Sequence, residues 1–539
     1  MKKHLNKIIL LVLIILGSFV RLNKLGTGGI GFFRDEAAMG LNTWSIIKTG
    51  ADEFGHSFPL FFRSFEVFFM PAYEYLSVPF FLLFGPTEFS TRVLSAFSGI
   101  LLIFVAYLIS KEFFKSERIG LFSAFVVSIA PWSIFYSRGA FEGNLALLFF
   151  SIGFYFWLKF FNSNKNKLFF VSLLFFVLSM YSYQAPRFVA PLFIAFSILL
   201  NKNWIKKLKL WIFGGIFTLL LYFPILIFSF TPAGNHRALG VSIFSSNNPV
   251  PGYNQQYGNW QKLYLFPKEV LSLYSHYFSP MNLFSKSDYN PQRIVPNFSV
   301  FYLWMLPFLL IGLINFLKLK TKNKKLLILW LLISPIPAAL TRDPFHTYRS
   351  ILFYIPLSIL IGFGISKFID SFKKYRIFVL LSIVVLSLYS LSSFFFNLFK
   401  VAPVTLWREW DYGYKEITDY VKTQPNDLRV VIDDPYTESY IHFLFYGVVP
   451  LKEYQKEALL IVADKYYKSS EELRPKKVGR FEFRVVDWPS ERGDRNTLFI
   501  FPSTRLYPSE FSTDPNLTLV KTIYSPGGDP AFYLIKSVK

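Results

Sequence analysis

Eleven apolar runs constrain the fold of this chain more than any other feature. Each run is near the length of about 20 residues that an α-helix needs to cross the hydrocarbon core of a bilayer. The runs cover residues 6–22, 91–110, 119–136, 143–161, 168–183, 187–200, 210–230, 299–317, 326–340, 349–366 and 377–397. The pattern predicts a polytopic α-helical membrane protein with eleven spans.

A twelfth apolar segment, residues 68–84, is a poorer candidate for a span. It contains Pro71, Glu74 and Pro79. Prolines and an acid within so short a segment suit a re-entrant or interfacial position better than a crossing. We therefore expect residues 68–84 to stay on one side of the membrane.

The basic residues orient these spans, because short cytoplasmic loops are rich in Lys and Arg. With eleven spans, one face collects the clusters within residues 2–7, 111–118, 165–167, 202–209, 318–325 and 367–376, whereas the short loops of the other face contain only Arg138, Arg187, Arg342 and Arg349. The prediction is a multi-pass plasma-membrane protein with a cytoplasmic N-terminus and an extracytoplasmic C-terminus.

The net charge of +23 therefore reflects loops that face anionic membrane lipids, and no nucleic-acid partner is implied. The basic and apolar N-terminus resembles a signal peptide, but no A-x-A-like cleavage site follows, and we expect it to remain as an anchor. Cysteine is absent, which excludes disulfides and thiolate metal sites.

Composition divides the chain into two predicted domains. Residues 1–397 form a transmembrane domain with outer loops 23–90 and 231–298, and residues 398–539 form an extracytoplasmic α/β domain. In the tail, five segments resemble short strands and one resembles a helix: strands at 428–436, 458–467, 480–488, 496–503 and 531–538, and a helix at 411–423. Asp433 and Asp434 at a strand end either bind a ligand or form a solvated turn, and the turn is the favoured interpretation.

Ionisable residues gather near helix ends on the predicted outer face. They are Asp35 and Glu36, Arg138 and Glu142, Arg187, and the group Arg342, Asp343, His346 and Arg349. Charges at the hydrocarbon edge are costly unless paired or hydrated, so such a cluster indicates a functional site. The planar fork of arginine suits phosphate oxygens.

A carboxylate near several arginines suits group transfer from a lipid-linked phosphate. The leaving phosphate is a stable anion once arginines neutralise it, so no general acid is needed there. One carboxylate then suffices as the base that takes the acceptor's proton. Attack from the side opposite the leaving group inverts the anomeric configuration.

Structural interpretations of the same residues remain open. Asp35 caps the helix expected from residue 36 to 48 as readily as it acts as a base. Taken singly, Arg138, Arg187 and Arg349 fit interfacial anchors, and His346 fits a loop residue that forms hydrogen bonds.

The order of motifs resembles the lipid-carrier-dependent glycosyltransferases of the C-type fold, the group that contains protein O-mannosyltransferases and the aminoarabinose transferase of lipid A. The motifs are RDEAAMGLNTWSIIKTG, FLLFGPTEFSTRVLSAFSG, PWSIFYSRGAFEGNLALLFF, the segment from YFSPMNLF to MLPFLLIGL, and TYRSILFYIPLSILIGFGI. The resemblance covers most of residues 1–400.

The resemblance implies roles for several of these residues. Asp35 matches the catalytic base, Glu36 its neighbouring acid, and Glu142 a second outer acid that is usually Asp. It further implies that Arg138, Arg187 and Arg349 hold the carrier phosphate, and that the loop 231–298, with Arg237 and Arg293, covers the acceptor side. Some relatives have a lysine before a proline after the first loop; here Met70 precedes Pro71, and Arg63 is the nearest cation. His346 is a further candidate substrate-binding residue.

The preferred prediction is an inverting glycosyltransferase that moves a hexose or pentose from a polyprenyl-phosphate donor to a protein, lipid or glycan acceptor. No metal site or cofactor is predicted, although Asp35 and Glu142 are compatible with a divalent cation. The alternatives are a transporter or flippase of lipid-linked glycans, and an inactive relative whose tail binds envelope glycans.

Overall fold

The computed structural model divides the chain into two units of contacting residues. The first, here the helical unit, comprises residues 1–23 and 92–397, and the second, here the α/β unit, comprises residues 24–91 and 398–539. The predicted outer loop 23–90 thus belongs with the C-terminal residues. The structure describes residues 2–27, 30–200, 207–232, 234, 259–286, 288–321, 323–341, 343–436, 438–469, 471 and 473–537.

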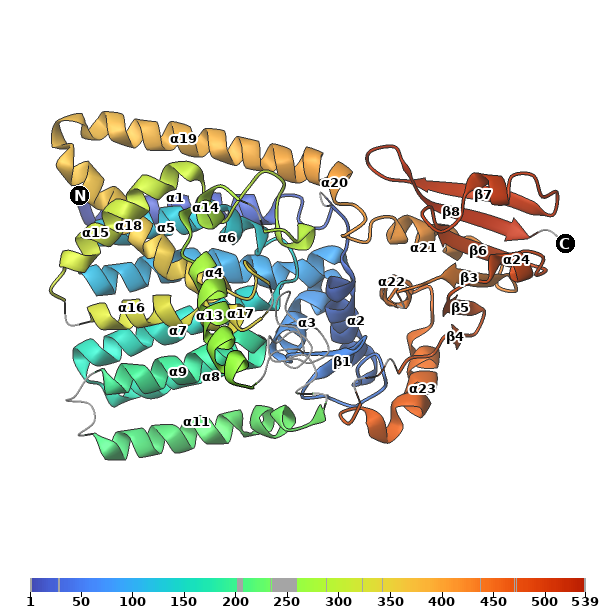
Figure 1. The fold of residues 1–539 in the computed structure, drawn as a ribbon, viewed down its shortest axis with the longest axis horizontal. Helices are drawn as coiled ribbons and strands as arrows, with labels where there is room; N and C mark the ends of the chain where they lie inside the picture. The colour runs from blue at the N-terminus through green and yellow to red at the C-terminus, as the bar shows by residue number, and fades with distance from the viewer. Residues whose placement is uncertain are drawn as a thin grey trace. The chain divides into compact units, whose positions relative to one another are not determined.

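The described helices follow the apolar runs of the sequence (Figure 1). The longer ones are α1 (Lys2–Leu22), α4 (Glu88–Phe114), α7 (Glu142–Ser163), α8 (Asn166–Ser182), α9 (Gln184–Leu199), α11 (Leu208–Ser229), α13 (Asn259–His276), α18 (Tyr354–Ser371) and α19 (Arg376–Phe396). The shorter ones are α5 (Glu117–Ile129), α6 (Pro131–Phe135), α14 (Pro280–Phe284), α15 (Leu306–Lys318), α16 (Lys324–Ile333) and α17 (Ile336–Ala339). Each predicted run overlaps at least one of them.

Among the described residues, six helices are long and apolar enough to cross a membrane. Two predicted runs are divided in the structure. Residues 119–136 form α5 and α6, which separate before Pro131, and residues 326–340 form α16 and α17. A proline lacks an N–H and favours the first turn of a helix, so the break before Pro131 follows from the sequence. The chain is a helical membrane protein.

Close packing in the helical unit depends on glycines where helices α15 and α18 contact each other (Figure 1). A Cβ atom on Gly364 would lie 1.8 Å from the carbonyl oxygen of Phe308, and one on Gly312 would lie 2.1 Å from that of Leu360. Small residues let membrane helices approach closely enough for backbone contact. These two glycines therefore set the spacing of the pair.

The N-terminal part of the α/β unit contains α2 (Arg34–Thr49), a two-stranded sheet of β1 (Phe62–Ser64) and β2 (Val67–Phe69), and α3 (Ala72–Phe84). Helix α3 has 13 residues and contains Pro79. Thirteen residues are fewer than a helical span normally needs. Helices α5 and α15 of the predicted spans also have 13 residues, and the expectation that residues 68–84 do not cross stays a prediction.

The C-terminal part is built on a six-stranded sheet of order β4-β5-β3-β6-β8-β7 (Figure 1). The strands are β3 (Arg429–Asp433), β4 (Lys477–Val478), β5 (Phe481–Arg484), β6 (Thr497–Pro502), β7 (Leu517–Tyr524) and β8 (Pro530–Ser537). Strand β3 is parallel to both β5 and β6, and β8 is antiparallel to β6 and β7. The connections contain η5 (Asn397–Val401), α20 (Ala402–Thr405), α21 (Tyr414–Lys422), α22 (Tyr440–Phe445), α23 (Leu451–Val462), η6 (Ala463–Lys465) and α24 (Trp488–Glu491).

One predicted strand is wrong. Residues 458–467 continue helix α23 and then form the 3-10 turn η6. Tyr454, Ala458 and Val462 are buried at a spacing of four residues, which is the period of a helix. A short apolar run viewed without its preceding residues hides that period.

Candidate active site

The Asp35–Glu36 pair lies in the first turn of α2, which begins at Arg34. The backbone of Phe33 is extended and precedes the helix, and the Glu36 carboxylate accepts a hydrogen bond from the Phe33 N–H at 3.2 Å. Glu36 is buried, whereas Asp35 is half-buried. Glu36, and not Asp35, therefore forms this capping interaction at the start of α2.

Arg34 fixes this turn through a bidentate ion pair with Asp411. Its Nε and Nη2 atoms lie 3.0 and 2.7 Å from the two Asp411 oxygens, and its backbone N–H donates to the same carboxylate at 2.9 Å. Arg34 also pairs with Glu438. Burial opposes its charge, but Asp411 raises the pKa of Arg34, so the guanidinium stays protonated.

Gly31 allows the chain before α2 to approach residues of the C-terminal part. A Cβ atom at Gly31 would lie 2.1 Å from the carbonyl oxygen of Trp410, the residue before Asp411. Packing against Trp410 therefore explains why a glycine stands at position 31, the last residue of the sequence GTGGIG (residues 26–31). Any larger residue would push the first turn of α2 away from Asp411.

Arg63, a predicted phosphate contact, is fully buried in the α/β unit. Its guanidinium donates to the backbone carbonyls of Tyr466, Ser469 and Glu471, the first two at 2.9 and 2.7 Å. The Arg63 N–H groups that a phosphate would need as donors are therefore already bonded to these carbonyls. The geometry gives Arg63 a structural role, which is to hold strand β1 against the segment after α23.

Next to Arg63, the carboxylates of Asp52 and Glu53 are both buried. Asp52 accepts hydrogen bonds from the N–H groups of Phe54 and His56 at 3.0 and 2.9 Å, and from the Tyr466 hydroxyl. Burial raises the pKa of Asp52 to about 7 and that of Glu53 well above its ordinary value. Neither residue was predicted from the sequence.

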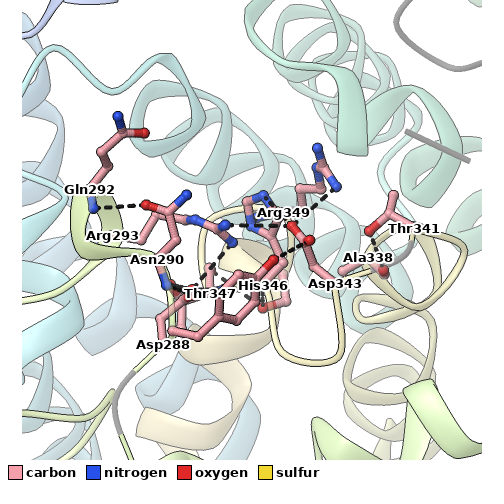
Figure 2. A network of polar contacts seen from close by, with 12 residues as sticks. Asp288, Asn290, Gln292, Arg293, Ala338, Thr341, Asp343, His346, Thr347 and Arg349 are labelled. Atoms are coloured by element: carbon pink, nitrogen blue, oxygen red, sulfur yellow. Dashed lines mark hydrogen bonds and ion pairs between the residues drawn. The ribbon is translucent and has the colours of Figure 1, made fainter. Parts of the chain in front are cut away.

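In the helical unit, three predicted substrate-binding side chains surround one carboxylate (Figure 2). Asp343 Oδ2 lies 3.5 Å from Arg293 Nη2, 3.5 Å from His346 Nε2 and 3.6 Å from Arg349 Nη1. The Tyr289 hydroxyl donates to the other oxygen. Charge-assisted hydrogen bonds normally measure about 2.7–2.9 Å, so one carboxylate is shared among three donors without a close contact to any of them.

A second carboxylate, that of Asp288, supports this cluster from the buried side. Its side chain is fully buried, lies 3.4 Å from Arg293 Nη1, and accepts from the N–H and hydroxyl of Thr347 at 3.0 and 2.7 Å. His346 Nδ1 accepts from the Arg349 N–H at 3.1 Å, which leaves Nε2 as the nitrogen that carries a proton. The loop 343–349 is thus held in one conformation with its donors directed at Asp343.

The remaining predicted residues of the helical unit have other partners. Arg138 donates to the carbonyls of Val20 and Arg21 at the end of α1, at 3.0 and 3.2 Å, and Arg187 donates to Gln184 and Ser229. A cation that contacts the last carbonyls of a helix stabilises its C-terminal end, so Arg138 stabilises the end of α1.

Glu142 is buried at the first residue of α7. The next residue, Gly143, donates its N–H to the Tyr348 hydroxyl at 2.8 Å, which ties the start of α7 to the loop of Arg349. The structure therefore joins Arg293, His346 and Arg349 through Asp343, and joins the Glu142 segment to the same loop. Asp35, Glu36 and Arg63 belong to the other unit.

Two predicted residues, Arg237 and Arg342, lie outside the described residues, as do residues 235–258 of the predicted loop 231–298. Among the residues that are described, no three His, Asp or Glu side chains are grouped to hold a metal ion. A divalent cation at Asp35 and Glu142 stays a prediction.

Sequence reasoning missed Asp288, Tyr289 and Thr347. The only signal was the segment SDYNPQR, in which an acid precedes Arg293 by five residues. It also misjudged Asp433 and Asp434, which are buried, with 2% and 4% exposure, rather than solvated. Asp433 accepts from the Val486 N–H and from Arg505, each at 3.0 Å.

The fold of this chain is similar to that of several solved structures at low sequence identity. ArnT from Cupriavidus metallidurans bound to undecaprenyl phosphate matches with a TM-score of 0.54 and 11% identity, over 98% of this chain and 97% of that one. The archaeal oligosaccharyltransferase AglB from Archaeoglobus fulgidus, in complex with an inhibitory peptide and a dolichol-phosphate, matches with a TM-score of 0.51 and 14% identity over 83% of this chain. The present chain spans 64% of the length of AglB.

A particular family also matches in sequence. Residues 70–228 match the family described as dolichyl-phosphate-mannose-protein mannosyltransferase. No curated protein matches the chain. The resemblance to C-type, lipid-carrier-dependent glycosyltransferases that the sequence indicated is therefore confirmed.

The buried Asp52 makes the stability of the α/β unit depend on pH. Its pKa is about 7 when folded and 3.8 ordinarily, so the folded state binds more protons between these values and stability falls as pH rises through that window. We expect Asp52→Asn to lose less thermal stability than the wild type between pH 5 and pH 8, as measured by unfolding temperature in detergent. Asp464→Asn, an exposed site in η6, is the control and should follow the wild type. Parallel curves for Asp52→Asn and wild type would contradict the assignment.

Proposed function

We propose that this chain is an inverting glycosyltransferase, which moves a sugar from a polyprenyl-phosphate carrier to an acceptor at the outer face of the membrane. The observation that carries the proposal is the cluster of Arg293, His346 and Arg349 around Asp343. Arg293 also pairs with Asp288, and in this proposal a phosphate replaces Asp343 as the shared partner of the three groups. A phosphate offers several oxygens to satisfy them.

In this proposal the cluster holds the phosphate of the donor. The two guanidiniums and the Nε2–H of His346 donate to phosphate oxygens and stabilise the charge that develops as the phosphate leaves. Asp343 is then an internal counter-ion, which neutralises the cations before the donor binds. Asp288 and Thr347 keep these side chains in place while the phosphate replaces Asp343 as their anionic partner.

Asp35 is the proposed base. The acceptor hydroxyl or amine attacks the anomeric carbon, a bond forms between them, and the bond from that carbon to the phosphate oxygen breaks. The acceptor's proton goes to the Asp35 carboxylate, and the bonding electron pair leaves with the phosphate. Because Glu36 supplies the capping contact of α2, the carboxylate of Asp35 is not required for that contact.

The similar structures support the kind of donor. The matched ArnT and AglB structures contain undecaprenyl phosphate and dolichol-phosphate, respectively, and the matched family is described by a dolichyl-phosphate-mannose donor. The lysine-rich loops support the orientation, because they favour the cytoplasmic side and leave the Arg349 loop on the outer side. Neither line distinguishes a hexose from a pentose.

Replacing the proposed base tests the reaction directly. Asp35→Asn should lower sugar transfer at least about 100-fold, the lower range for loss of a general base, and leave donor binding unchanged. Transfer is measured with purified protein and a radiolabelled polyprenyl-phosphate sugar. Asp464→Asn, which removes an exposed acid of the same unit, should retain activity. Full activity of Asp35→Asn would remove Asp35 from the base role.

Two opposite changes in the cluster test the phosphate site. Arg349→Ala should weaken binding of undecaprenyl phosphate, and Asp343→Asn should strengthen it, each on the order of tenfold, because a charge about 4 Å away contributes about 1–4 kcal/mol. Binding is measured by microscale thermophoresis in detergent.

The Arg118–Asp370 pair provides matched controls in the same unit. The Arg118 guanidinium donates to both carboxylate oxygens of Asp370 at 2.8 and 2.6 Å. Arg118→Ala and Asp370→Asn should leave lipid binding unchanged. Weaker binding by Asp343→Asn would mean that Asp343 organises the cations instead of competing with the phosphate.

A further inference from the structure

A cavity formed entirely within the α/β unit is lined neither by the proposed base nor by the proposed phosphate-binding residues. Its volume is about 420 Å³, which is within the range of small-molecule sites. Asp433 and Asp434 at the end of β3, Ser503 and Thr504 after β6, and Phe532 of β8 line it. These residues lie at the same end of the strands, beyond the carboxyl ends of β3 and β6. The start of β8 lies at this end too, because β8 runs antiparallel to β6.

The topology of the sheet favours a binding site at this end of the strands. After β3 the chain continues to β5 on one side, whereas after β6 it continues to β7 and β8 on the other side. Loops that leave two neighbouring parallel strands in opposite directions open a crevice beyond the carboxyl ends of the strands. Ligands of open α/β sheets bind in such crevices.

Aromatic rings form much of the cavity wall. Trp407, Tyr414, Tyr436 and Phe532 line it, and the Tyr414 ring is 5.2 Å from that of Phe532, centre to centre. Tyr436 is 77% exposed, although tyrosines usually bury part of their ring. An exposed aromatic ring at the mouth of a cavity provides a face on which a flat apolar surface can stack.

The acids of the cavity are mostly neutralised by arginines. The ion pairs are Arg34 with Asp411 at 2.7 Å and with Glu438, Arg505 with Asp433 at 3.0 Å, and Arg474 with Asp434 at 3.7 Å. Paired carboxylates still accept hydrogen bonds from hydroxyls, but they attract a free cation weakly. This balance favours a neutral ligand with many hydroxyl groups.

His442 adds a buried group that lacks a hydrogen bond among the described residues. It lines the cavity with 1% exposure, and neither ring nitrogen has a hydrogen-bond partner there. Its Nε2 is 3.8 Å from Asp411, beyond hydrogen-bond length, and its ring stacks on Tyr414 at 4.5 Å. Because Asp411, its charged neighbour, is 3.8 Å away, a ligand hydroxyl within hydrogen-bond distance of this imidazole would be favourable.

We propose that this cavity binds a neutral carbohydrate, and that this carbohydrate is the acceptor of the transferase. The apolar face of a sugar ring would stack on Tyr436, and its hydroxyls would donate to the paired carboxylates. The acceptor assignment rests on the proposed function and on chain position, since Arg34 lines the cavity and Asp35 is the next residue. A sugar in the cavity therefore lies beside the turn that carries the proposed base.

Binding of free sugars to the full-length protein in detergent tests the site without requiring turnover. The probes are glucose, galactose, mannose and N-acetylglucosamine and their β-linked disaccharides, detected by saturation-transfer NMR and quantified by calorimetry. We expect at least one to bind, Tyr436→Ala to weaken its binding at least tenfold, and Tyr436→Phe to retain it. Tyr507→Ala, at an exposed tyrosine that does not line the cavity, should bind as the wild type does.

The outcomes separate this proposal from the proposed reaction. Asp35→Asn should bind the same sugar as tightly as the wild type, whether or not transfer occurs. Absence of binding by every probe, or equal binding by Tyr436→Ala and wild type, overturns the carbohydrate site. A sugar that binds in the cavity but is not glycosylated by the active wild-type enzyme overturns its assignment as acceptor.

Discussion

The ion pair between Arg34 and Asp411 is the interaction on which the proposed chemistry depends. It joins the first turn of α2 to a residue that is far away in the sequence, with three contacts between 2.7 and 3.0 Å. Removing one partner of a largely buried pair leaves an uncompensated charge, which costs on the order of 3–5 kcal/mol. The segment that carries Asp35 is therefore a fixed part of the α/β unit and not a free loop between membrane helices.

The second constraint is the electrostatic state of the Asp343 cluster. Its three cationic or proton-donating groups are held by Asp288, Thr347 and the backbone, so they cannot separate to reduce their mutual repulsion. Asp343 lies 3.5–3.6 Å from all three, and Asp288 lies 3.4 Å from Arg293. A preorganised site of this kind binds an incoming anion without reorganisation, which is what stabilisation of a leaving phosphate requires.

Much of the helical unit was predictable, because hydrocarbon imposes a length and a composition that are visible in any window of the sequence. The strands of the tail were less predictable. Residues 458–467 resembled a strand but largely continue a helix, and β7, in which buried and exposed residues do not alternate, was missed. The grouping of residues 24–91 with the tail depends on single contacts such as Arg34 with Asp411, and no local pattern reveals them. For the same reason Arg349, His346 and their shared partner Asp343 were noted from their charge, whereas Asp288, which contacts Arg293 and Thr347, was not.

The most direct test of the central claim is a cryo-electron microscopy structure of the full-length protein with undecaprenyl phosphate bound. The account predicts that the phosphate oxygens lie within hydrogen-bond distance of Arg293 and Arg349, that the Asp343 carboxylate has moved away from them, and that Asp35 faces the same aqueous space. A phosphate bound elsewhere, with the three donors still around Asp343, would contradict it.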